Sequence, residues 1–201
     1  KTDEDNIKNN PYVISELHGL PYYITQKIDG SSGTYYHHNS KFGVCSRNQD
    51  LKQDSNNAFW KISDKYNIQK ILFDYYKGAN IAIQGECYGL GIQDNLLQEP
   101  DLKFAMFNIL NTDTSEYYGF KELIEFSKVT SIPMVNILIE GESFNYTLKL
   151  LQEYANGLRY PNGNLCEGIV IRPKIEKFSQ TLQGRLSGKI ISEPFELKYG
   201  H

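Results

Sequence analysis

The sequence predicts an α+β fold from three observations. Apolar strand-like runs and amphipathic segments follow one another without the strict strand–helix–strand alternation of a parallel α/β sheet. The composition, 40% hydrophobic and 22% charged, is that of an ordinary globular protein. A length of 201 residues is enough to bury a substantial core. We therefore expect one domain over residues 1–201, with room for two lobes.

The first part of the chain predicts a group of strands followed by helices. Apolar runs bounded by turn residues predict a hairpin from Tyr22–Ile28 and Thr34–His38, with Phe42–Ser46 pairing next. Apolar residues at helical spacing predict a helix over Asn57–Tyr66, continuing near Ile68–Tyr76. The many tyrosines and phenylalanines mostly belong to strands, because aromatic side chains pack well on a pleated surface.

The second part continues the mixture of strands and helices. A helix over Phe120–Lys128 ends before Pro133, which cannot continue it. Another helix over Thr147–Ala155 is stopped by Asn156-Gly157. Four further runs complete the elements: Ile81–Tyr88, Phe104–Leu110, Glu167–Arg172 and Ile190–Lys198.

Charge and cysteine content narrow the protein class. The net charge of −3 is not that of a typical nucleic-acid binder, so any RNA contact needs a local basic patch or a further domain. No apolar run approaches a membrane span, and the polar N-terminus is not a signal peptide. Cys45, Cys87 and Cys166 lack metal-ligand spacing, so we expect small core residues in an intracellular, cytoplasmic protein.

Two further patterns exclude other chemistries. His37 and His38 are expected at the edge of the hairpin, and no histidine–cysteine spacing indicates zinc. The chain has no Gly-x-x-x-x-Gly-Lys phosphate loop, which argues against a P-loop kinase.

The most informative segment is Lys27-Ile28-Asp29-Gly30, at the end of an apolar run. A lysine held at a strand end can act as a nucleophile when its neutral form is favoured. By strand periodicity Asp29 would share the face of Lys27 and could hold a divalent metal, while Gly30 permits close approach of a phosphate or of backbone. Alone, the four residues more often form a hairpin with an Asp-Gly turn and an exposed lysine.

Five more motifs follow in order: Phe42–Asn48, Ile83–Gly89, Lys103–Ile109, Cys166–Pro173 and Arg185–Ser192. Together with the lysine segment they resemble the collinear motifs of the covalent nucleotidyltransferases, which include ATP-dependent RNA and DNA ligases and mRNA capping enzymes. The resemblance is closest to ATP-dependent RNA ligases of the Naegleria type, related to the phage T4 RNA ligase 2 group. It covers nearly the whole chain, including the opening Lys1–Glu4.

This resemblance implies a fold and a reaction. The fold would be a nucleotidyltransferase (ATP-grasp-like) domain with two antiparallel sheets flanked by helices around a nucleotide cleft. Lys27 would take AMP from ATP, AMP would pass to an RNA 5′-phosphate, and a 3′-hydroxyl would attack to seal the strand. We expect a monomer without membrane association, an RNA with 5′-phosphate and 3′-hydroxyl ends as partner, and a role in RNA repair. The N-terminal OB-like domain of such ligases is expected to be absent from this chain.

The resemblance also implies roles for single residues. Lys27 would be the nucleophile, and Lys189 would contact the α-phosphate as the second catalytic residue. An acidic set would surround Mg²⁺ or Mn²⁺, which commonly keep several waters: Asp29, Glu86 and Glu167. The nucleotide would be bound by Gln26, Ile28, Arg47, Glu86, Phe107 and Lys198.

Several of these assignments have alternatives. Arg47 could instead form a surface ion pair, and Glu86 could be an outward-facing strand carboxylate, although a carboxylate in an apolar strand is costly unless paired. Phe104 competes with Phe107 for stacking on adenine, and either could be plain core. Arg172 is expected to be structural or RNA-facing.

The sequence departs from the family pattern near Lys189. Many relatives have Lys-x-Lys and an aromatic residue just before it, whereas this chain has Gly188-Lys189-Ile190-Ile191. Lys198 either supplies the missing cation or is a solvated lysine. Two other functions therefore stay open: a DNA ligase or capping-type enzyme, and a degenerate domain that binds nucleotide or RNA without turnover. DNA ligases and capping enzymes usually append a C-terminal OB domain, so an end at His201 counts against them.

Overall fold

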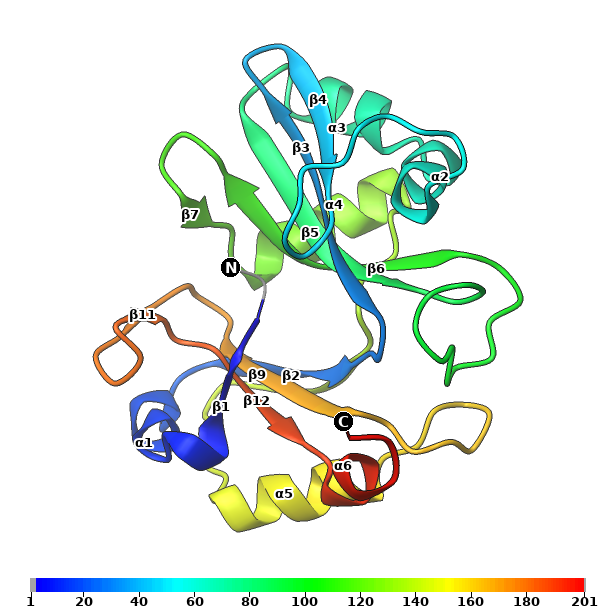
Figure 1. The fold of residues 1–201 in the computed structure, drawn as a ribbon. Helices are drawn as coiled ribbons and strands as arrows, with labels where there is room; N and C mark the ends of the chain where they lie inside the picture. The colour runs from blue at the N-terminus through cyan, green and yellow to red at the C-terminus, as the bar shows by residue number, and fades with distance from the viewer. Residues whose placement is uncertain (1–2, 201) are drawn as a thin grey trace. The chain divides into compact units, whose positions relative to one another are not determined.

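The computed structural model describes residues 3–200 and divides them into two compact units (Figure 1). The first unit contains residues 3–28 and 135–200, and the second contains residues 29–134. Lys1 and Thr2 of the opening segment lie outside the described residues. The α+β class predicted from the sequence is confirmed, since each unit combines a sheet with helices.

The first unit is built on a five-stranded sheet in the order β1-β12-β9-β2-β8. Neighbouring strands are antiparallel except β1 and β12, which pair in parallel at one edge. The strands are β1 (Asp5–Asn6), β2 (Tyr22–Lys27), β8 (Ile137–Gly141), β9 (Gly168–Pro173) and β12 (Gly188–Ile191).

Helices cover one face of this sheet. Figure 1 shows α5 packed on β9 and β12, with α6 beside it. The remaining elements of the unit are short: η1 (Ile7–Asn9), α1 (Tyr12–Leu17), α5 (Leu148–Gly157), α6 (Glu193–Tyr199) and a small hairpin of β10 (Phe178–Ser179) and β11 (Gly184–Arg185).

Strand alternation separates the two faces of the sheet. Ile24, Ile169 and Ile190 are fully buried in one cluster with Leu151 of α5, so they form the helix-covered face. Side chains alternate between faces along a strand, and directly paired residues share a face. Lys27, opposite Gly168, therefore belongs to the other face.

The second unit has a five-stranded antiparallel sheet in the order β4-β3-β5-β6-β7. Helices α2, α3 and α4 contact β4, β3 and β6 respectively (Figure 1). The elements are β3 (Ser31–His38), β4 (Lys41–Cys45), α2 (Ala58–Lys65), α3 (Ile68–Tyr75), β5 (Ile81–Tyr88), β6 (Lys103–Asn111), β7 (Glu116–Tyr117) and α4 (Phe120–Thr130).

The same division of faces holds in the second unit. Tyr35 and Ile83 pair across β3 and β5 and lie in a fully buried cluster with Leu72 of α3. The adjacent pair, Thr34 and Gln84, belongs to the opposite face, where the Gln84 amide donates to the Thr34 hydroxyl at 3.3 Å. One face is thus apolar and covered by helices, and the other carries polar side chains.

The helices α2 and α3 follow the predicted pattern, and the structure shows why they are separate. Asn57 caps α2, because its side-chain oxygen accepts a hydrogen bond from the Phe59 amide at 2.9 Å. Asn67 stands between the helices with φ +52°, a left-handed conformation that interrupts α-helical geometry.

Two predicted strands end earlier than expected. The single element expected over Ile190–Lys198 is strand β12 followed by helix α6, because the Ser192 hydroxyl caps the helix by accepting from the Phe195 amide at 3.4 Å. Strand β2 ends at Lys27. Asp29 therefore lies beyond the strand, and strand periodicity does not place it on the face of Lys27.

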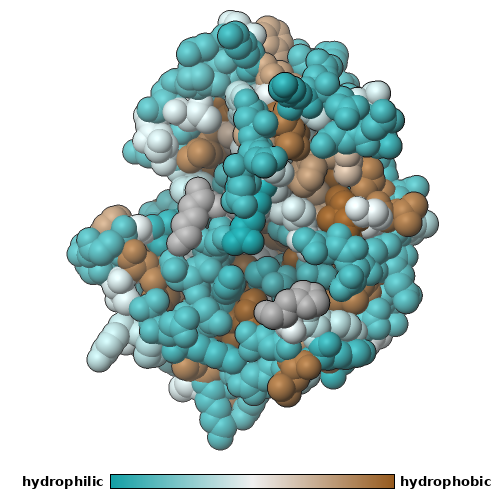
Figure 2. All heavy atoms as spheres, in the orientation of Figure 1, coloured by the Kyte–Doolittle hydropathy of each residue, from teal (hydrophilic) through white to brown (hydrophobic). Residues whose placement is uncertain are grey.

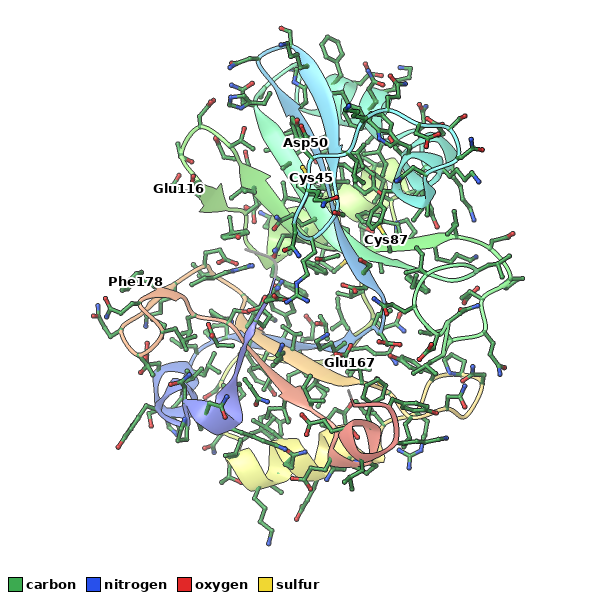
Figure 3. All side chains as sticks on the ribbon, viewed as in Figure 1. Cys45, Asp50, Cys87, Glu116, Glu167 and Phe178 are labelled. Carbon is green, nitrogen blue, oxygen red and sulfur yellow. The ribbon has the colours of Figure 1, made fainter. Side chains whose placement is uncertain are left out.

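Two side-chain expectations are wrong. His37 is buried rather than at an edge, because β3 pairs with β4 on one side and β5 on the other. Cys45 is only partly buried, and its thiol lies 3.6 Å from Asp50 Oδ1 (Figure 3). Cys87 and Cys166 are buried as expected.

Figure 2 shows hydrophilic side chains over most of the visible face, with hydrophobic ones in smaller groups between them. No helix within residues 3–200 combines the length and the apolar character needed to cross a membrane.

Candidate active site

The central feature of the site is an ion pair between Lys27 and Glu167. The Lys27 ammonium lies 2.7 Å from Glu167 Oε1, and the two side chains are 22% and 17% exposed. Lys27 is the last residue of β2, and Glu167 directly precedes β9, where Figure 3 labels it. Because Lys27 is paired with Gly168, the register of two strands brings the pair together.

Gly168 is required at this position. Its φ is +156°, and a Cβ atom there would lie 2.1 Å from the Ile190 carbonyl oxygen. Only glycine therefore lets β9 begin this close to β12. The backbone at Glu167 is fixed further by its carbonyl, which accepts from the Ser192 amide at 2.9 Å.

Lys189 lies on the same sheet face as Lys27. Thr25 and Lys189 are both paired with Val170, one from each side, and Thr25 shares the face of Lys27 by strand alternation. This face therefore presents two lysines and one glutamate, all partly buried. Such a set can bind phosphate oxygens and hold a reactive amine.

The side chain of Gln26 has another partner. Its amide oxygen accepts from Asn136 Nδ2 at 3.0 Å, and its backbone amide donates to the Asn136 carbonyl at 2.9 Å. Strand alternation assigns Gln26 to the helix-covered face, opposite to Lys27. Ile28 is buried. Their nucleotide contacts stay predictions.

In the second unit, Gly30 brings the chain close to strand β5. A Cβ atom on Gly30 would lie 2.5 Å from the Cys87 carbonyl oxygen and 3.0 Å from the Glu86 side chain. The close-approach role expected for this glycine is thus explained by backbone packing. Asp29 precedes it in the chain, so the loop that carries Asp29 is anchored beside Glu86.

Glu86 and Phe107 lie where β5 and β6 change register. Gln84 pairs with Asn108 and Gly85 with Met106, so Phe107 is the extra residue of a β-bulge. Bulges re-aim side chains, and Phe107 is only partly buried.

The competing aromatic, Phe104, is plain core. It is fully buried and packs edge-on against Tyr35, with ring centroids 5.2 Å apart. Arg47 is exposed in the loop that follows β4.

The predicted metal ligands are divided between the units: Asp29 and Glu86 belong to the second, Glu167 to the first. Among residues 3–200, no three His, Cys, Asp or Glu side chains gather into a group that could hold a metal ion. Carboxylates are nevertheless the donors that Mg²⁺ uses, and this ion needs only one or two of them besides water and substrate phosphates. Each of these carboxylates is therefore a chemically suitable ligand for Mg²⁺.

Arg172 was expected to be structural or RNA-facing, and its contacts are those of a structural residue. It is buried, forms an ion pair with Glu4, and donates from Nε to the Ser187 hydroxyl at 2.9 Å. This pair ties the segment before β1 to the central strand β9.

Lys198 is exposed near the end of α6, with its ammonium 4.8 Å from the centre of the Tyr199 ring. Ile191, at the place of the family's second lysine, is buried. The structure thus has no lysine at that strand position, and the role of Lys198 stays a prediction.

Comparisons with known proteins gave a matching family and similar solved structures. The sequence profile described as RNA ligase matches residues 20–191. Naegleria gruberi RNA ligase solved with pyrophosphate is 29% identical, with a TM-score of 0.87 over 99% of this chain and 57% of that chain. A lysine-to-methionine variant of that ligase with AMP and Mn is 28% identical, with a TM-score of 0.87 and the same coverage. A lysine-to-alanine variant with ATP and Mn is 29% identical, with a TM-score of 0.86 over 98% and 56% of the two chains.

A search of curated proteins gave no match. The chain spans 57% of the length of the Naegleria gruberi structure solved with pyrophosphate.

Proposed function

Because the chain belongs to the RNA ligase family, we propose that it is the adenylyl-transferring catalytic domain of an ATP-dependent RNA ligase. The observation that supports this most directly is the Lys27–Glu167 pair, with the two groups 2.7 Å apart at the ends of adjoining strands. A lysine held in this way is suited to form one bond with a phosphorus atom in a fixed direction.

In the first step, the Lys27 amine attacks the α-phosphorus of ATP. A P–N bond forms, the bond to the β-phosphate oxygen breaks, and pyrophosphate leaves. The ammonium must lose a proton before it attacks, and the Glu167 carboxylate is within hydrogen-bonding distance to accept it. Lys189, on the same sheet face, would bind the α-phosphate and offset its developing negative charge.

Nucleotide binding would use Arg47, Phe107, Gln26, Ile28 and Lys198. Arg47 is exposed and has the planar fork that matches a phosphate or a ribose edge. Phe107, set apart by the bulge, would stack on adenine. Gln26 would act through its backbone, because Asn136 engages its side-chain oxygen.

Carboxylates of the predicted set Asp29, Glu86 and Glu167 would hold Mg²⁺ or Mn²⁺, which needs only one or two of them besides water and phosphate oxygens. The ion would neutralise phosphate charge during departure of pyrophosphate.

In the later steps, AMP would pass from Lys27 to the 5′-phosphate of an RNA. A 3′-hydroxyl would then attack that phosphate, sealing the strand and releasing AMP. With a net charge of −3, the domain would bind RNA through a local cation group rather than overall basicity. We also propose a monomer that acts in the cytoplasm, where Cys45, Cys87 and Cys166 stay free thiols.

The test is covalent labelling with ATP or GTP carrying label on the α-phosphate. The parent protein, Lys27→Ala and the control Lys149→Ala, an exposed lysine of α5, are incubated with Mg²⁺ and separated under denaturing conditions. We expect label from ATP on the parent and on Lys149→Ala, and none on Lys27→Ala.

Label from GTP instead would assign a capping-type activity. Absence of label from both nucleotides, in folded protein free of bound AMP, would refute an enzymatic role and favour a binding domain.

A further inference from the structure

A buried tyrosine outside all predicted motifs touches both members of the catalytic pair. The Tyr160 hydroxyl donates to the Lys27 carbonyl oxygen at 3.2 Å and accepts from the Glu167 backbone amide at 3.4 Å. The side chain is only 2% exposed. One phenolic oxygen therefore joins the last residue of β2 to the residue before β9.

The loop that carries Tyr160 is a tight turn. Pro161-Asn162-Gly163 follows it, a composition typical of turns, and Gly163 has φ +85°. The Tyr160 amide donates to the Asn164 carbonyl, and its carbonyl accepts from the Gly163 amide, both at 2.9 Å. Tyr160 is thus fixed at its backbone as well as at its hydroxyl.

The backbone at Lys27 has partners both in β9 and in the Tyr160 loop. Strand β8 pairs with β2 only as far as Thr25, so the ladder on that side stops before Lys27. Buried carbonyl groups require a donor, and the Lys27 carbonyl accepts from the Tyr160 hydroxyl and from the Cys166 thiol, the latter at 3.5 Å. The end of β2 is therefore held by the Tyr160 loop as well as by its pairing with β9.

We propose that Tyr160 is a positioning residue for the Lys27–Glu167 pair. Its hydroxyl fixes the two backbone points from which the nucleophile and the carboxylate project, and so sets the direction in which the amine meets phosphorus. The inference rests on the proposed adenylylation. It assigns Tyr160 no contact with ATP.

The test compares Tyr160→Phe with the parent and with Tyr35→Phe. Tyr35 is a matched control, because it is also fully buried and its hydroxyl also donates to a backbone carbonyl, that of Phe59 at 3.1 Å, in the second unit. For each protein, single-turnover formation of the labelled adenylate is measured over a range of ATP concentrations with Mg²⁺, at a temperature where circular dichroism shows it folded.

Misplacement of a reacting group typically costs rate rather than affinity, so we expect Tyr160→Phe to lower the maximal rate by about tenfold or more. The ATP concentration for half-saturation should stay that of the parent, and Tyr35→Phe should keep the parental rate.

An unchanged maximal rate in Tyr160→Phe would overturn the inference, and so would an equal fall in Tyr35→Phe. A change confined to half-saturation would overturn it too, because it would indicate a contact with ATP. A parent protein that takes no label would refute the proposed function itself, and the inference with it.

Discussion

Replacing Arg172 with methionine should destabilise the first unit severely. The Arg172 side chain is 4% exposed and pairs with Glu4, which is 14% exposed. Methionine keeps much of the volume but leaves the Glu4 carboxylate buried without its main partner. Breaking a buried ion pair from one side typically costs about 3 to 5 kcal/mol.

The pKa of Glu4 gives this prediction a pH dependence. Burial alone would raise the pKa of Glu4, but Arg172, together with Arg185 and Ser187, outweighs burial and holds it below its ordinary value of 4.5. A lowered pKa in the folded state stabilises the protein above the unfolded value, and that stabilisation is lost as the pH falls through the folded value. Without Arg172 the pKa of Glu4 should rise, so parent and variant should differ less at pH 4 than at pH 7.

The assay is thermal unfolding followed by circular dichroism at both pH values. For a chain of about 200 residues, each kcal/mol lowers the midpoint by roughly 2 to 4 °C, so Arg172→Met should unfold at least about 6 °C below the parent at pH 7. The double variant Glu4→Gln/Arg172→Met removes both charges and should recover part of the loss.

The exposed pair Lys70–Asp74 provides the control, and Lys70→Met should leave the midpoint nearly unchanged. An Arg172→Met midpoint equal to that of Lys70→Met, or a double variant less stable than Arg172→Met, would refute the reasoning.

Three further predictions concern other positions. Gly168→Ala should slow adenylylation and lower the free energy of unfolding, measured by urea unfolding, by about 2 kcal/mol or more. The reason is that the added Cβ would lie 2.1 Å from the Ile190 carbonyl oxygen. Burial would raise the pKa of Glu16, but hydrogen bonds from Thr181, Ser179 and Gln180 hold it below its ordinary value of 4.5. The stability that the ionised Glu16 contributes should therefore be lost as the pH falls through its folded-state pKa, and the unfolding midpoint of Glu16→Gln should fall less than that of the parent on acidification. Lys189→Ala should slow single-turnover adenylylation by at least about tenfold. An equal fall in the rate of Lys198→Ala would indicate that Lys198, in α6, supplies the cation that the family's second lysine provides.

Each of these predictions has a contrary outcome. Gly163→Ala controls for backbone strain alone, because nothing lies within 4 Å of its Cβ position; equal losses at both glycines would exclude the clash. An identical acid dependence in Glu16→Gln and the parent would show that Glu16 does not stabilise the small hairpin. An undiminished rate in Lys189→Ala would remove Lys189 from the site.

The sequence predicted the helices and strands well where the signal is local. Most predicted strands and helices are found, because apolar periodicity and turn residues such as Asn156-Gly157 mark them along the chain. Short elements such as α1 and β8 were missed, since they contain too few residues to show a period. The start of α6 was missed although Ser192 followed by Pro194 is a helix-start signal.

The site was predicted only where a motif carries it. The resemblance pointed to Lys27 and Glu167, which the structure brings together, and to Lys189, which it places on the same face. Tyr160 has no comparable signal, because its role depends on two hydrogen bonds between segments distant in sequence. The buried partner of Arg172 was not predicted for the same reason, since Glu4 lies 168 positions away.

The way the chain is divided has a consequence for its biogenesis. The second unit is one continuous stretch, residues 29–134, whereas the first combines residues 3–28 with residues 135–200. Translation proceeds from the N-terminus, so the second unit can fold on the ribosome while β2 still lacks β8, β9 and β12. Joining β2 to them closes a loop of roughly a hundred residues, an entropic cost that grows only slowly with length. Lys27 is therefore made early but acquires Glu167 late, so a nascent or truncated chain would carry this lysine without its ion-pair partner.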